Sequence, residues 1–130
     1  DRSPSRGLGD VYKRQADDMT GRFVQLTNAG GQTTNTVTRT IGLAVNSLEP
    51  GGIQTPHRHN AIALTLCLGG DDVYSMIEGE KVQWQRHAVM VTPPAELHSH
   101  HNQGKDTMLS LVAQDGGVFY NARTIGFSFD

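Results

Sequence analysis

The 130-residue sequence has few aromatic side chains, little cysteine and little charge. The shortages of cysteine and of charge each exclude a class of protein. Its single cysteine, Cys67, excludes an intrachain disulfide and any metal site built from several cysteines. Charged residues make up only 18% of the chain and the formal net charge is -2, without a basic stripe. We therefore expect neither nucleic acid nor a membrane surface as a partner. At this length a single hydrophobic core serves the whole chain.

The N-terminal segment differs from the rest of the chain. Residues 1–15 combine basic residues with glycine and proline and have almost no apolar pattern, and Asp10–Gln15 resembles the translated transposon end used to prepare metagenomic DNA libraries. We expect residues 1–15 to be a non-native tail or sequencing scar and residues 16–130 to be one domain. The native N-terminus is then unknown and the compartment stays open, although a polymeric substrate would require secretion.

Short strand-like runs separated by turn residues fill the remainder of the chain. No window holds an apolar period of 3.6 for ten residues, so we expect no long amphipathic helix. The predicted strands are Arg22–Leu26, Thr40–Leu48, Ala61–Leu68, Val73–Ile77, Lys81–Gln85, Ala88–Thr92, Met108–Ala113, Val118–Tyr120 and Ile125–Phe129. Many short strands at regular turn spacing predict an all-β, antiparallel sandwich or barrel.

All six histidines fall between His57 and His101. His57 and His59 are two residues apart, as are His98 and His100, and on a strand each pair places both rings on one face. Two neighbouring strands could thus bring imidazoles to one ion. Neutral imidazoles suit zinc, copper, iron or nickel better than magnesium or calcium.

Two motifs carry a family resemblance. Gly51, followed after five residues by His57-Arg58-His59 and closed by Gly70, resembles the first motif of the cupin superfamily. Pro93-Pro94-Ala95, followed by His98 and Asn102, resembles the second. The resemblance implies a single antiparallel jelly-roll barrel, the cupin fold.

Departures from the cupin motifs bear on the ligand set. Ala63 stands where many cupins have a metal-binding Glu, so the resemblance implies three metal ligands: His57, His59 and His98. Ala95 and His87 stand where the second motif usually has glycine.

Three functions follow from this pattern. The chain resembles single-domain copper cupins that cleave cellulose oxidatively, which implies one copper ion per chain, peroxide or reduced dioxygen as oxidant, and cellulose or a related polysaccharide as substrate. It is also similar to gentisate-type ring-cleaving dioxygenases, in the Val-Thr-Pro-Pro run before His98 and in Arg123–Phe127. That alternative implies Fe(II), dioxygen and a small aromatic acid. The third is a non-catalytic sugar-binding cupin that keeps its metal only for structure.

Other residues near the motifs are assigned by strand parity and context. His100 shares the face of His98, and we predict a catalytic role for it, as a proton relay, a hydrogen-bond donor or a fourth ligand. Arg58 points away from the ligands, so no carboxylate clamp is evident beside them. Gln54 is a candidate outer contact of the site. His87 and His101 are expected to be bystanders.

The aromatic residues leave two interpretations open. Trp84, Tyr74 and Tyr120 could stack on a sugar ring, but core or interface packing is the commoner use of such positions. A small apolar β domain also gains core by joining sheet edges or faces, and we expect a homodimer.

Overall fold

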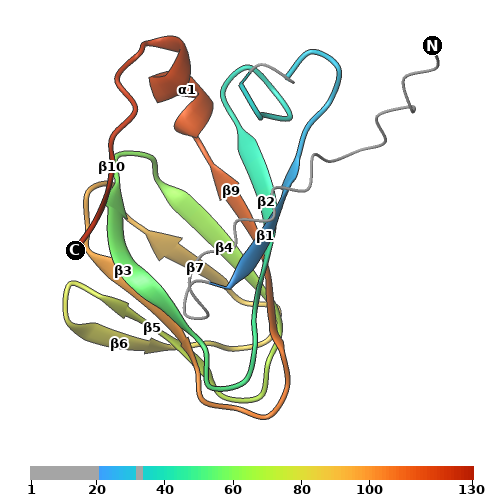
Figure 1. The fold of residues 1–130 in the computed structure, drawn as a ribbon, viewed down its shortest axis with the longest axis vertical. Coiled ribbons are helices and arrows are strands. Elements are labelled where there is room, and N and C mark those ends of the chain that lie inside the picture. The colour runs from blue at the N-terminus through green and yellow to red at the C-terminus, as the bar shows by residue number, and fades with distance from the viewer. Residues whose placement is uncertain (1–20, 32–33) are drawn as a thin grey trace.

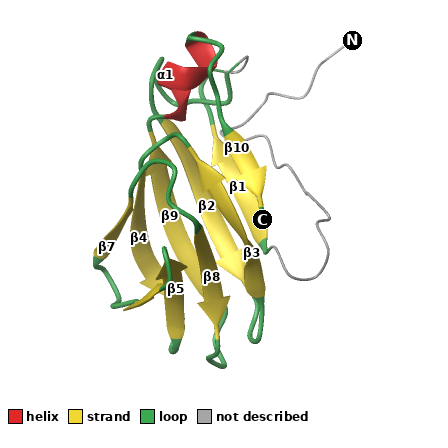
Figure 2. Ribbon diagram, turned by 90° about the vertical axis from the view of Figure 1, so that its left-hand side faces the viewer, coloured by secondary structure: helices red, strands yellow, loops and turns green. Residues whose placement is uncertain are grey.

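The computed structural model describes residues 21–31 and 34–130, which form two five-stranded antiparallel sheets facing each other (Figures 1 and 2). The first sheet has the order β1-β2-β9-β4-β7, with bounds Arg22–Leu26, Gly42–Leu48, Met108–Gln114, Ala63–Gly69 and Val89–Thr92. The second has the order β10-β3-β8-β5-β6, with bounds Phe127–Phe129, Ile53–His59, His98–Asn102, Val73–Ile77 and Glu80–Gln83. This arrangement confirms the predicted jelly roll. The predicted tail, residues 1–15, lies outside the described residues.

One prediction of secondary structure is wrong. Val118–Tyr120, predicted as a strand, belongs to the short helix α1 (Gly116–Asn121). The turn begins where the Val118 amide donates to the Asp115 carbonyl, and a short apolar run cannot be assigned to strand or helix by periodicity alone. Within the described part of the chain, no helix is long and apolar enough to cross a membrane.

The strands β3 and β8, which carry the histidine pairs, are absent from the predicted strand list. Both read as polar sequence, and β3 contains Pro56, which cannot donate a backbone hydrogen bond. The register of β3 against β8 shifts between Gln54 and His57, so Pro56 lies within a β-bulge. A bulge bends a strand and redirects its side chains, which is why bulges are frequent beside functional sites.

Positive backbone φ angles explain why the cupin motif usually has glycine at the two positions where this chain departs from it. Ala95 and His87, which stand where the motif usually has glycine, both have φ of 66°. This left-handed region disfavours residues with a Cβ atom, so Ala95 and His87 both adopt a backbone conformation that is less costly for glycine.

The apolar core is small and lies at one end of the space between the sheets. Leu48, Val73 and Met108 form its buried cluster, and Trp84 packs against them, in agreement with a packing role for the tryptophan. Many of the other buried residues are polar. Asn102, for example, donates to the carbonyls of Leu48 and Asp106 and so fixes the adjoining loop.

Candidate metal centre

Three histidines converge at the other end of the interior. His57 and His59 come from β3 and His98 from the adjacent β8, and one ring nitrogen of each lies within 4.8 Å of the other two. The bulge in β3 brings His57 directly opposite His98 in the register, with ring centroids 4.2 Å apart. All three side chains are buried. The structure therefore brings together the three predicted ligands.

Backbone hydrogen bonds fix the same tautomer in all three rings. The Nδ1 atoms of His57, His59 and His98 lie 2.8, 2.7 and 2.9 Å from the carbonyl oxygens of Thr55, Ala61 and Glu96. Since a carbonyl can only accept, each Nδ1 carries the proton and each Nε2 keeps a lone pair. Three neutral imidazoles held in this way fit a divalent transition metal and leave coordination positions for other ligands.

Burial keeps the rings of His57 and His98 neutral. Desolvation is the main cause that lowers the pKa of His98 to about 4; the neighbouring His57 and His59 also lower this pKa, while the hydrogen bond to the Glu96 carbonyl raises it. Desolvation likewise lowers the pKa of His57. Charging a ring inside the protein is costly when nothing compensates the charge. At neutral pH the lone pairs of these two rings are therefore available without prior loss of a proton.

His100 lies behind the three histidines. Its ring centroid is 5.9 Å from that of His98, and its Nδ1 is 2.6 Å from the Ser75 hydroxyl oxygen, which accepts a hydrogen bond from the Trp84 indole. The Ser75 hydroxyl hydrogen then goes to His100 Nδ1, which places the ring proton on Nε2. Desolvation first, and His98 second, lower the pKa of His100 to about 3. His100 is not among the described residues that line the pocket, and its catalytic role stays a prediction.

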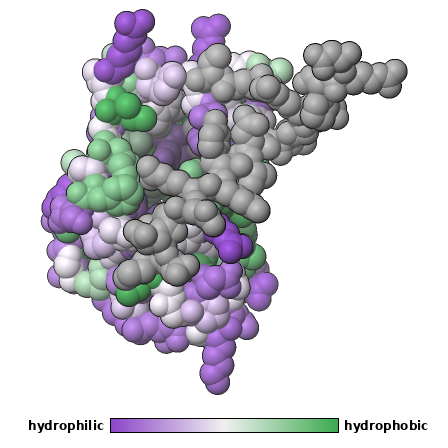
Figure 3. Space-filling model, viewed as in Figure 1, coloured by the Kyte–Doolittle hydropathy of each residue, from purple (hydrophilic) through white to green (hydrophobic). Residues whose placement is uncertain are grey.

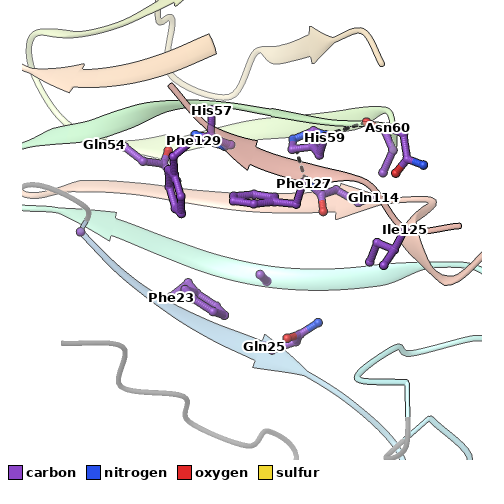
Figure 4. A pocket seen from close by; sticks show the side chains of 14 residues that line it. Phe23, Gln25, Gln54, His57, His59, Asn60, Gln114, Ile125, Phe127 and Phe129 are labelled. Atoms are coloured by element: carbon purple, nitrogen blue, oxygen red, sulfur yellow. Dashed lines mark hydrogen bonds between the residues drawn. The ribbon is translucent and has the colours of Figure 1, made fainter. Parts of the chain in front are cut away.

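A pocket of about 320 Å³ lies between the sheets beside the histidines (Figure 4). One wall carries His57 and His59, and the opposite wall carries Phe23 and Gln25 from β1. Its remaining described lining residues are Gly21, Ala44, Gln54, Asn60, Ala61, Gln114, Gly116, Ile125, Phe127 and Phe129. The lining is apolar and aromatic with a few side-chain amides, which is typical of a small-molecule site.

The strand β10 supplies the aromatic edge of this pocket. It pairs with β3 so that Phe127 lies opposite His59 and Phe129 opposite His57. The Phe127 ring stacks on the His57 ring at 5.3 Å and 25°, although Phe127 is 55% exposed. In Figure 3 hydrophobic side chains gather over the segment that leads into β10. Phenylalanines beside metal ligands offer a flat apolar surface to a ring-shaped ligand.

Arg58 faces away from the pocket, as its strand parity predicts. Its guanidinium donates to the Glu78 carboxylate at 2.9 Å and to the Ala95 carbonyl at 3.0 Å. No described lining residue of the pocket is Lys or Arg. Among the described lining residues, therefore, no cationic side chain is available to pair with an anionic ligand.

Of the other residues that the sequence singled out, Gln54 is the one found in the described lining of the pocket. Tyr74 stacks on His101, both outside the pocket lining, and Tyr120 is exposed on α1. Sequence reasoning missed Gln114, whose side-chain amide reaches His59 Nε2 at 3.3 Å. Strand parity could have found it, because Gln114 continues the inward series of β9 one residue beyond the predicted strand end.

The comparisons with known proteins agree with this geometry. No protein-family profile matches the chain. It is similar to a gentisate 1,2-dioxygenase of Haloferax sp., with 32% identity over 82 residues that cover 62% of this chain and 23% of that protein. It is also similar to a 1-hydroxy-2-naphthoate 1,2-dioxygenase of Nocardioides sp., with 29% identity over 91 residues that cover 64% of this chain and 24% of that protein. The chain thus spans about a quarter of the length of these relatives.

Solved structures give the same fold. A salicylate 1,2-dioxygenase from Pseudaminobacter salicylatoxidans superposes with a TM-score of 0.79 at 23% identity, covering 85% of this chain and 32% of that one. The chain has the cupin jelly-roll fold and is similar in sequence to gentisate dioxygenases. At that identity the superposition supports the fold of this cupin alone, and the sequence similarity to the dioxygenases is a separate observation.

Proposed function

We propose that this cupin holds one Fe(II) ion through His57, His59 and His98 and cleaves the ring of a small aromatic substrate with dioxygen. The observation that carries the proposal is the set of three buried Nδ1-protonated histidines, two of which, His57 and His59, line an aromatic pocket. The similarity to ring-cleaving dioxygenases favours iron and an aromatic substrate over the copper and cellulose interpretation, which no comparison supports.

Bound iron would supply the open coordination positions and the redox chemistry that the reaction of dioxygen with an aromatic ring requires. A dioxygenase puts both oxygen atoms of dioxygen into the product while a ring carbon–carbon bond breaks, so no external reductant is consumed. The chain's own contribution is to hold the ion with neutral ligands and to line the site with the apolar rings of Phe23, Phe127 and Phe129. The flat ring of a substrate fits against Phe127.

Metal reconstitution tests the proposal. Apo-protein is loaded with Fe(II), Cu(II) or Zn(II), and each form is given gentisate, salicylate or 1-hydroxy-2-naphthoate in air, or cellulose with peroxide. We expect oxygen consumption and a ring-opened product only with iron. Oxidised oligosaccharides only with copper would instead support cellulose cleavage. Tight metal binding without any product would support the non-catalytic sugar-binding alternative.

We also propose a homodimer that joins the outer faces of the first sheet. Outward side chains on neighbouring strands of this face are apolar, including Leu64 opposite Val91 and Leu66 opposite both Val89 and Leu111. Leu64, Val89 and Val91 are 44%, 58% and 47% exposed. A second copy offers the same apolar face and can cover it by twofold symmetry. Light scattering should give twice the chain mass, and Val91→Lys should give the monomer mass; a monomeric parent protein would overturn this proposal.

A further inference from the structure

Gln114 is the described side chain whose amide contacts a nitrogen of the histidine triad. It is the last residue of β9, a central strand of the first sheet, whereas His59 belongs to the second sheet. Its register partners Gly42 and Ala63 are small, so the strands on either side leave room for the long side chain. Figure 4 shows the amide reaching across the pocket toward His59.

The direction of this hydrogen bond follows from the tautomer. His59 donates its Nδ1 hydrogen to the Ala61 carbonyl, so its Nε2 accepts and the Gln114 amide nitrogen donates, at 3.3 Å. The same Nε2 lone pair is the one that His59 offers to an ion. One lone pair cannot serve both, so an occupied metal site leaves the Gln114 amide in need of another acceptor. A donor left unpaired in an apolar pocket is costly.

We propose that Gln114 is a specificity-determining residue that donates a hydrogen bond to an oxygen of the bound substrate once His59 Nε2 is engaged. The inference rests on the proposed metal site and deepens the proposed function. Gln114 selects a substrate with an acceptor oxygen, a phenolate or a carboxylate, close to the triad. In the metal-free protein the same amide satisfies His59, so Gln114 exchanges one acceptor for another as the site fills.

Gln114→Met, which keeps the length of the side chain but removes the donor, tests this role. The matched control is Gln103→Met. Gln103 is an exposed glutamine that is not among the described lining residues of the pocket. Azide serves as a small anionic acceptor, titrated into Co(II)-loaded protein and followed by the visible cobalt bands. This readout does not depend on turnover, so it stands even if no aromatic substrate reacts.

We expect Gln114→Met to weaken azide binding about 10- to 100-fold, the usual cost of losing a hydrogen bond to a charged acceptor, while Co(II) affinity changes less than about threefold. Gln103→Met should change neither affinity. Unchanged azide affinity in Gln114→Met, or an equal loss in the control, would overturn the proposal. Equal losses of cobalt and azide binding would also overturn it, since Gln114 would then only support His59.

Gln114→Glu keeps the test decisive if the methionine variant does not fold. A carboxylate at this position removes the donor and adds an oxygen ligand beside the three histidines. We expect Co(II) to bind at least about tenfold more tightly and azide to bind at least about tenfold more weakly. Failure of the proposed ring cleavage, with these binding results intact, would leave the role of Gln114 standing and assign a different substrate to the pocket.

Discussion

The two ends of the strand β9 lie in different surroundings. Met108, at its start, is opposite Leu48 and belongs to the apolar core cluster with Val73. Gln114, at its end, lines the pocket and contacts His59. The same strand therefore contributes to stability at one end and to ligand binding at the other. A substitution at one end of β9 should therefore change stability, and a substitution at the other end should change ligand binding.

The largest expected effect is on metal binding. His98→Ala removes one of three neutral ligands, and two imidazoles do not complete the site. We expect stoichiometric metal to disappear from the purified protein, as measured by elemental analysis. His87→Ala changes an exposed histidine outside the triad and should retain one ion per chain. Retention of stoichiometric metal by His98→Ala would contradict the ligand assignment.

A substitution in the apolar core should have the opposite effect, a loss of stability without a loss of metal binding. Leu48→Ala leaves a cavity beside Val73 and Met108 and should lower the free energy of unfolding by about 2–5 kcal/mol. Below the unfolding temperature, metal stoichiometry should not change. The control is Val118→Ala at an exposed position of α1, for which we expect a loss of less than about 1 kcal/mol. Equal losses in the two variants in denaturant titrations would show that the core cluster has no special role.

Ser75 connects the core to the histidines and should give an intermediate effect. Ser75→Ala leaves both the Trp84 indole and His100 Nδ1 without their shared partner. We expect the free energy of unfolding to fall by about 1–3 kcal/mol while metal affinity changes little. Ser128→Ala, at an exposed serine of β10, should be nearly neutral. A large loss of metal affinity in Ser75→Ala would place His100 among the ligands.

The smallest predicted effect is a gain in the free energy of unfolding. Ala95→Gly should raise the free energy of unfolding by about 1 kcal/mol, because glycine adopts φ of 66° without the steric cost that alanine has there. Ala88→Gly, at an exposed alanine outside the positive-φ region, should instead lower it by about 0.5–1 kcal/mol. Thermal unfolding of both variants measures the difference, and a loss in Ala95→Gly would contradict the strain at this turn.

The sequence predicted those parts of the fold that depend on local pattern. Arg22–Leu26 and Val73–Ile77 form strands with the predicted bounds, since each is a short run bounded by turn residues. The spacing of two residues predicted that His57 and His59 share one face of a strand, whereas the choice of His98 as the third candidate ligand came from the cupin resemblance. Ala95 was recognised as a departure from the motif, and its backbone angle shows why the motif usually has glycine there.

Most of the structural features that the sequence did not predict depend on contacts between segments far apart in the chain. The bulge at Pro56, which sets His57 opposite His98, has no signature in the spacing of the histidines. Phe127 reaches the site only because β10 pairs with β3, and Gln114 only because the two sheets face each other. α1 forms where a run of three apolar residues was compatible with either helix or strand.

The three candidate ligands lie on two hydrogen-bonded neighbours of a single sheet, whereas Phe23, Gln25 and Gln114 reach the pocket from the other sheet. The geometry of the candidate ion site is therefore set within one sheet, while the facing wall of the pocket belongs to the other. We expect substitutions in β1, β2 and β9 to change the shape of the pocket without moving the strands that carry the three histidines.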